Sequence, residues 1–429
     1  MTKNKFLFPF MMITSLFFMW GFVHNLDPIL IPHLKKSFSL STLQASLVDS
    51  AVFIAYFVMA LPAGFIMKKY GYKTGIILGL LLFATGSFLF IPAANTQLYL
   101  FFLLALFIIA CGLTILETAA NPYASLLGPK ETSTFRLNFA QSFNGLAATL
   151  APIIGAKIIL TEGFSDEALG KMTDAARQAA LASEAATVKM PYLILGGIIL
   201  LIAIIFIFLK LPEIKEHEVG AHGEAVEDYG NAETEILHAL KHRQLKWGVV
   251  AQFFYIGAQI CVFSFFILYA TKAAGIGQQE AAKYLGYGMG MAFMIGRFVG
   301  TFLMRFISAP KLLTIYALIN IALSAVAMVA GGQVALYTVI AIAFFMSIMF
   351  PTIFSLGIRD LGKDTKFGSS LIIMSIVGGA VLPPVMGLIS DQTENIQMGY
   401  IVPLICFLVV FLFGWKGHQV KNRVATVNV

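Results

Sequence analysis

Residues Leu116 to Asn144, LETAANPYASLLGPKETSTFRLNFAQSFN, decide how this sequence folds. They place one carboxylate, that of Glu117, and four amide side chains inside two apolar segments. Each segment is long enough to cross the hydrocarbon core of a bilayer, which is about 30 Å thick. An ionised carboxylate at that depth costs at least about 2.5 kcal/mol, so it normally faces a polar cavity or serves a function. The stretch therefore predicts transmembrane helices arranged around a polar interior.

The composition extends this interpretation to the whole chain of 429 residues. Hydrophobic residues make up 59% of the sequence and charged residues 12%, about half the charged share of an average soluble domain. An integral membrane protein in a lipid bilayer is therefore predicted. The net charge of +7 does not indicate a nucleic-acid partner, because membrane proteins concentrate Lys and Arg in cytoplasmic loops. The three cysteines lie in apolar runs at unrelated spacings, so neither a disulfide nor a metal site is expected from them.

Apolar runs of about 20 residues, the length that spans a bilayer, occur twelve times. They cover residues 8–33, 44–67, 74–92, 98–126, 134–160, 190–211, 246–273, 280–305, 310–330, 335–358, 366–389 and 398–416. Most Lys and Arg residues fall in the termini and in alternate connections, which is the pattern expected if both termini are cytoplasmic. The sequence thus predicts an all-α protein with twelve transmembrane helices.

A hydrophilic segment at residues 212–245 divides the predicted helices into two groups of six. Its polar composition is typical of a linker between domains. We therefore expect an N-terminal six-helix bundle over 1–211, a cytoplasmic linker, and a C-terminal six-helix bundle over 246–429. Four histidines in the linker are loosely spaced, and no metal site is expected from them. They are His217, His222, His238 and His242.

The two groups of helices also repeat each other weakly in sequence. GFIMKK at 64–69 resembles GTFLMR at 300–305, and GPKET at 128–132 resembles GKDT at 362–365. The paired glycines are offset by 236 and 234 residues, so two independent matches agree on nearly one register. Facing six-helix halves form the major facilitator fold, whose ligand site lies near the membrane midplane between the halves.

Polar side chains recur at helical spacing in three of these segments. In the fourth, Glu117 and Asn121 share a face, and Pro122 interrupts the helical hydrogen bonding beside them. The fifth carries an amide at every third residue: Asn138, Gln141 and Asn144. The seventh carries two amides and a phenol roughly on one face: Gln252, Tyr255 and Gln259. These stripes predict a polar cavity shared by the two halves.

Such a cavity suits a sugar, because a sugar hydroxyl both donates and accepts hydrogen bonds, as an amide group does. The C–H face of the ring packs on aromatic side chains, for which Trp20 and Phe143 are candidates. Membrane helices also use Asn and Gln as interhelical fasteners, worth about 0.6 kcal/mol each. Three stripes together with Glu117 favour the cavity, while each single amide is open to either interpretation.

Four motifs resemble the fucose, galactose and glucose proton-symporter family of the major facilitator superfamily. They are LETAANPY at 116–123, FRLNFAQSFN at 135–144, AQFFYIGAQ at 251–259 and FPTIFSLGIRDLGKDTKFGSS at 350–370. The likeness extends over nearly the whole chain. It implies a proton-coupled sugar importer of the bacterial inner membrane, with the proton as coupling ion and no other cofactor. We expect the protein to be a monomer. We do not expect it to be an enzyme, since the sequence holds no nucleotide loop, metal cluster or nucleophile motif.

The first segment departs from the pattern of that family, in which an essential Asp follows an Asn by three residues and directly precedes Ile-Leu. Asn25 and Trp20 match the pattern, but Pro28 occupies the position of the acid and Asp27 lies one residue earlier. One residue is about 100° around an ideal helix, although the distortion at Pro28 could return the carboxylate to the cavity. Alternatively, Asp27 caps a helix break or lies near the outer interface.

The resemblance implies alternating access coupled to one proton, with Asp27 and Glu117 as the two acids. Desolvation disfavours the charged form of a carboxyl group, which allows it to load and release a proton at physiological pH. The residues expected to bind the sugar are Trp20, Asn25, Asn121, Gln141, Asn144, Gln252, Tyr255 and Gln259. Facilitated diffusion, sodium coupling and a sugar sensor without transport activity are the alternatives. The identity of the sugar stays open, because epimers differ by a single hydroxyl.

Overall fold

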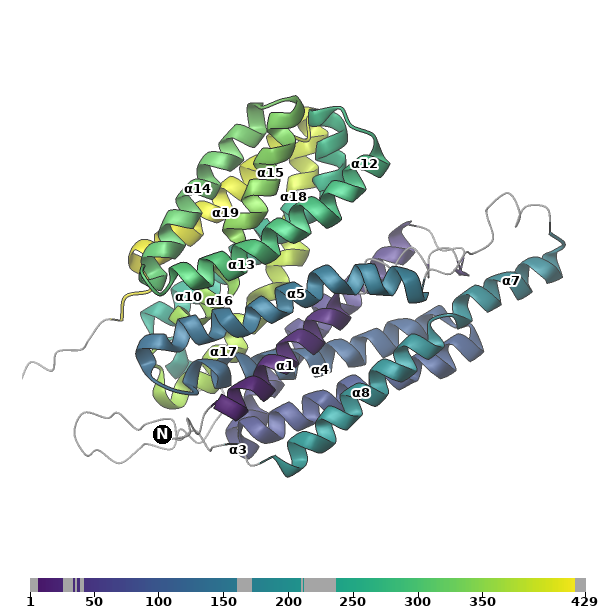
Figure 1. Cartoon of the computed structure of the whole chain (residues 1–429), viewed down its shortest axis with the longest axis horizontal. Coiled ribbons are helices and arrows are strands. Elements are labelled where there is room, and N and C mark those ends of the chain that lie inside the picture. Colours follow the sequence, from purple (N-terminus) through teal and green to yellow (C-terminus); the bar gives the residue numbers. More distant parts are fainter. Residues whose placement is uncertain are drawn as a thin grey trace, which may run out of the picture. The chain divides into compact units, whose positions relative to one another are not determined.

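The structure is a computed structural model that describes residues 7–25, 34, 37–38, 42–159, 172–209, 211 and 237–420 (Figure 1). Within these ranges the chain is helical and contains no strand, which confirms the all-α prediction. Nine helical stretches of the described residues are long and apolar enough to cross a bilayer. The number of twelve transmembrane helices stays a prediction.

The chain forms two compact units. Unit 1 comprises Met1–Ala120 and Phe139–Glu213, and unit 2 comprises Asn121–Asn138 and Ile214–Val429. Most of the expected linker, residues 212–236, lies outside the described residues. Six-helix bundles over 1–211 and 246–429 therefore remain a prediction, and the segment Asn121–Asn138 groups with unit 2 although it connects two helices that lie mainly in unit 1.

Unit 1 is built from long apolar helices. They are α1 (Leu7–His24), α3 (Thr42–Thr96), most of α4 (Tyr99–Leu126) and of α5 (Ser133–Ile159), α7 (Asp174–Ala186) and α8 (Lys189–Phe208). α8 packs along α3 (Figure 1), and the rings of Phe90 and Tyr192 stack there at 3.7 Å. A Cβ atom at Gly112 of α4 would lie 2.6 Å from the carbonyl oxygen of Gly79 on α3. Glycine at this contact lets the two helix backbones approach closely.

The helix α3 contains a break at Gly71. The backbone there has φ 82° and ψ 169°, which is not helical. Such a positive φ strongly favours glycine, because a Cβ atom would be strained in this region. The break falls between the predicted segments 44–67 and 74–92, so each part of α3 corresponds to one of them.

Unit 2 contains ten α-helices of the described chain. They are α10 (Arg243–Ser264), α11 (Phe266–Tyr269), α12 (Gln278–Lys283), α13 (Met291–Leu303), α14 (Ala309–Val329), α15 (Gly332–Met346), α16 (Met349–Gly357), α17 (Thr365–Met374), α18 (Gly378–Thr393) and α19 (Ile401–Leu412). α10 packs against α16, α17, α18 and α19. A Cβ atom at Gly378 would collide with the carbonyl oxygen of Phe253 on α10. Because α10 is enclosed so closely, a polar side chain on its buried face is shielded from bulk solvent and is costly if it lacks a hydrogen-bond partner.

Candidate functional site

Glu117 lies on α4 in unit 1 and is 8% exposed. Its carboxylate oxygen Oε1 accepts a hydrogen bond of 2.7 Å from the hydroxyl of Tyr56 on α3, which is also buried. The expected intramembrane carboxylate thus has a specific partner on a neighbouring helix. Tyr56 was not among the residues predicted from the sequence. A tyrosine in an apolar segment has only its hydroxyl to suggest a polar role, and nothing in the sequence pattern pairs it with Glu117.

Three of the predicted binding residues of unit 1 lie around the C-terminal half of α1. Trp20 is buried and packs against Phe17, with 4.3 Å between the ring centroids. A Cβ atom at Gly21 would lie 2.9 Å from the backbone oxygen of Asn144, so α5 approaches α1 closely at this point. Asn25 donates from Nδ2 to the carbonyl oxygen of Gly21 over 2.7 Å. The structure therefore brings Gly21 of α1 against Asn144 of α5, and the Asn25 amide bonds to the backbone at the end of α1.

The other amides of α4 and α5 differ in what they contact. Gln141 is 3% exposed and lies one turn before Asn144 on α5. Asn121 is fully buried and lies one turn beyond Glu117 on α4. Asn138 donates to the carbonyl oxygen of Thr134 over 2.9 Å and to the hydroxyl of Thr352 on α16 over 3.2 Å. Asn138 thus joins two helices. This is the interhelical fastening that was the alternative interpretation for each single amide of the stripe.

α10 holds the predicted binding residues of unit 2. Gln252 and Tyr255 are fully buried, and Gln259 is half-buried. Neither amide atom of Gln252 has a hydrogen-bond partner among the described residues. The Tyr255 hydroxyl also lacks a well-formed hydrogen bond there, although the Arg297 guanidinium and the backbone of Phe350 lie near it. Unpaired buried polar groups cost about 1–3 kcal/mol each, so this face of α10 is suited to a polar ligand.

Two further polar residues are buried in unit 2. Arg297 on α13 is 6% exposed, donates from Nε to the carbonyl oxygen of Ser347 over 3.1 Å, and places its guanidinium over the ring of Phe293. These contacts give Arg297 a structural role. Asn320 on α14 is fully buried, and its amide atoms have no hydrogen-bond partner among the described residues. Sequence reasoning missed Asn320, whose signal was a lone amide in the apolar segment 310–330.

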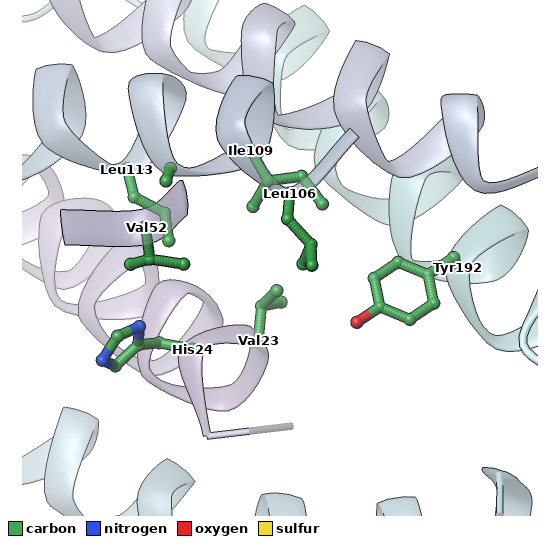
Figure 2. Close-up of a pocket in the computed structure, with 8 residues that line it drawn as sticks. Val23, His24, Val52, Leu106, Ile109, Leu113 and Tyr192 are labelled. Atoms are coloured by element: carbon green, nitrogen blue, oxygen red, sulfur yellow. The ribbon is translucent and has the colours of Figure 1, made fainter. Parts of the chain in front are cut away.

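A small pocket in unit 1 is distinct from the predicted binding residues (Figure 2). It is lined by Val23, His24, Val52, Leu106, Ile109, Ala110, Leu113 and Tyr192. Its side chains are apolar except for the His24 imidazole and the Tyr192 hydroxyl. None of the described lining residues carries an amide of the kind expected to hold sugar hydroxyls. Asp27, the second expected coupling acid, and Pro28 lie outside the described residues.

Known proteins resemble this chain over nearly its full length. The sequence profile of the Major Facilitator Superfamily matches residues 10–372. The L-fucose-proton symporter of Escherichia coli (strain K12) is 43% identical, over 96% of this chain and 93% of that protein. A glucose/galactose transporter of Brucella abortus (strain 2308) is 39% identical, over 97% and 96%.

One solved structure adds a likeness in three dimensions. It is that of a major facilitator superfamily transporter in the outward conformation, with a TM-score of 0.88. The two chains are 42% identical, and the match covers 96% of this chain and 99% of the other. The similarity therefore holds for the fold as well as for the sequence.

Proposed function

The chain belongs to the major facilitator superfamily, and we propose that it imports L-fucose or a related hexose together with a proton. It is a transporter of the membrane and no enzyme. The names of two relatives, an L-fucose-proton symporter and a glucose/galactose transporter, support the substrate class. The observation that carries the proton coupling is the buried carboxylate of Glu117, held by the hydroxyl of Tyr56 inside the apolar helices of unit 1.

In this proposal, the sugar is held by amides from both predicted halves of the chain, 1–211 and 246–429. Gln141 and Asn144 supply donors and acceptors from α5, and the same half of the chain contributes Asn25, Asn121 and the ring of Trp20. Gln252, Tyr255 and Gln259 supply donors and acceptors from α10. The amide of Gln252 has no hydrogen-bond partner among the described residues. This supports the role, because a bound hydroxyl would satisfy both its donor and its acceptor. Asp27 serves as the outer acid that takes up the proton.

Alternating access requires that some contacts break during every transport cycle. Lys130 pairs with Asp360 over 2.9 Å, and the hydroxyls of Thr134 and Ser355 lie 2.9 Å apart. Lys130 and Thr134 belong to the first predicted half, 1–211, and their partners belong to the second, 246–429, so a rocking motion of the halves must separate these pairs. An exposed ion pair contributes at most about 1 kcal/mol. Such weak contacts can stabilise one conformation of the transport cycle and still break when the halves move.

The remaining parts of the proposal concern topology. The chain has twelve transmembrane helices, in six-helix bundles over 1–211 and 246–429 with a linker at 212–245, so both termini lie on the same side of the membrane, the cytoplasmic one. The Lys and Arg distribution supports this orientation. The protein works as a monomer in the bacterial inner membrane, since each chain carries both halves of the site.

Uptake by proteoliposomes tests the proposal directly. L-Fucose, D-galactose and D-glucose are offered with and without an inwardly directed proton gradient, in sodium-containing and sodium-free buffer. We expect one of these sugars to accumulate with the proton gradient in both buffers, and a protonophore to abolish accumulation. Accumulation that requires sodium would indicate sodium coupling, and equilibration that is independent of both gradients would indicate a facilitator. Either result would overturn the proton-coupled mechanism.

A further inference from the structure

Two histidines and a buried aspartate converge at the start of α10. The Asp364 carboxylate oxygen Oδ2 lies 2.8 Å from Nδ1 of His238 and 2.8 Å from Nε2 of His242. The Asp364 side chain is 7% exposed, whereas the two imidazoles are 25% and 29% exposed. Within the described residues this is the one group of three or more His, Cys, Asp or Glu side chains whose ligand atoms lie within 4.8 Å of one another. The group is therefore closed on the side of the carboxylate and open to solvent on the side of the imidazoles.

The backbone holds the three side chains in this arrangement. Lys241 and His242 donate their amide hydrogens to the carbonyl oxygens of His238 and Ala239, which makes a tight turn between the two histidines. Asp364 ends the short helix η4 (Gly362–Asp364) before α17. Gln244 in the first turn of α10 donates to the carbonyl oxygen of Arg359 over 3.1 Å, so a second contact joins the same two stretches of chain.

The spacing of the three ligand atoms is close to that of a metal site. Zinc binds imidazole nitrogen and carboxylate oxygen at about 2.0–2.2 Å with tetrahedral geometry, which separates neighbouring ligand atoms by about 3.3 Å. The nitrogen-to-oxygen distances of 2.8 Å need to lengthen by only about 0.5 Å to admit the ion between them. Two imidazoles with one carboxylate favour Zn²⁺, Co²⁺ or Ni²⁺ over Mg²⁺ and Ca²⁺, which prefer oxygen ligands.

We propose that His238, His242 and Asp364 bind a divalent transition-metal ion, Zn²⁺ by the chemistry of the ligands. The exposed edges of the imidazoles provide the entry path and leave a fourth position for water. The ion fastens the residues before α10 to the connection between α16 and α17. Sequence reasoning expected no metal site among the linker histidines, because the third ligand lies 122 residues beyond His242.

Metal titration of the purified full-length protein tests the proposal. The protein is prepared with a purification tag that contains no histidine, stripped with a chelator, and titrated with Zn²⁺ against a chromophoric chelator. We expect one tightly bound Zn²⁺ per chain, and Co²⁺ should produce the visible absorption bands of a tetrahedral site. His242→Ala and His238→Gln should each weaken Zn²⁺ binding by about 100-fold or more, since even loss of a residue that only orients a ligand costs about 10–100-fold.

The matched controls are His217→Ala and His222→Ala, which change the other two linker histidines. They should leave Zn²⁺ affinity and stoichiometry unchanged. His238→Gln keeps a side-chain donor for the carboxylate, so its folding should survive and its metal affinity can be measured even if Asp364→Asn fails to fold. Absence of stoichiometric Zn²⁺ binding by the wild type, or unchanged affinity in both ligand variants, would show that the group is held by hydrogen bonds alone and would overturn the proposal.

Discussion

The hydroxyl of Tyr56 donates a hydrogen bond of 2.7 Å to the carboxylate of Glu117, although the two residues are 61 positions apart in the sequence. A hydrogen bond to a charged group contributes about 1.5–3 kcal/mol. A tyrosine hydroxyl also accepts hydrogen bonds, so the same pair can persist with reversed donor and acceptor once Glu117 is protonated. The arrangement lets a buried carboxyl group change its protonation state without leaving a polar atom unpaired.

Replacing Glu117 with Gln separates hydrogen bonding from proton exchange. The amide of Glu117→Gln can still pair with the Tyr56 hydroxyl, but it has no proton to load and release. We expect sugar accumulation driven by a pH gradient to vanish in proteoliposomes, while sugar binding and counterflow remain. Accumulation at the wild-type level would remove Glu117 from the coupling path.

The variant Tyr56→Phe removes the partner and keeps the carboxyl group. The buried carboxylate then loses a donor, and the free energy of unfolding should fall by about 1.5–3 kcal/mol. Denaturant unfolding in detergent measures this change. Tyr70→Phe, at an exposed position of the same helix, is the control and should have no effect. Equal stability of the two variants would contradict a bond that stabilises the fold.

Gln252 gives opposite predictions for a ligand contact and for a helix fastener. Gln252→Met keeps the volume and removes two buried polar atoms that lack partners among the described residues. If these atoms bind the sugar, the free energy of unfolding of the variant without sugar should rise by about 1–3 kcal/mol. The variant should also bind sugar at least about 5-fold more weakly. The control is Gln244→Met on the same helix, where the amide donates to Arg359; it should lose stability and keep affinity. A destabilised Gln252→Met with normal affinity would assign a fastening role.

The amides of α5 can be sorted by the same comparison. Gln141→Ala, Asn144→Ala and, on α10, Gln259→Ala should each weaken sugar binding by about 1–3 kcal/mol, because buried partners of the sugar lose their hydrogen bonds. Asn138→Ala should lower stability instead, since its amide bonds to Thr134 and Thr352. Calorimetric titration of the purified variants measures the affinities. Unchanged values in all three binding variants would refute the proposed site.

Asp27 tests whether the displaced acid of the first segment couples transport to the proton. Asp27→Asn should abolish proton-driven uptake and preserve counterflow. The double variant Asp27→Asn with Pro28→Asp returns the acid to the position found in the family and should retain coupling. Alkalinisation of the medium on addition of sugar to cells reports the proton signal. An undiminished signal from Asp27→Asn would show that this carboxylate is structural.

Much of the fold follows from local features of the sequence. Apolar segments of bilayer length fold as helices because only internal hydrogen bonds satisfy the backbone in lipid. Gly71 marks the break in α3, and it lies between the predicted segments 44–67 and 74–92. Burial of Glu117 and Gln252 could be predicted in the same way, since both lie within such segments.

The sequence by itself determined that this protein is helical, spans a membrane and buries carboxyl and amide groups at helical spacing. Only the tertiary structure decided what those groups contact: Tyr56 for Glu117, Thr352 for Asn138, and two histidines for Asp364. Hydrophobic periodicity specifies which face of a helix is buried, but it carries no information about which residue of another helix lies opposite. That choice depends on the packing of helices far apart in the chain, where a shift of one residue moves a side chain by about 100°.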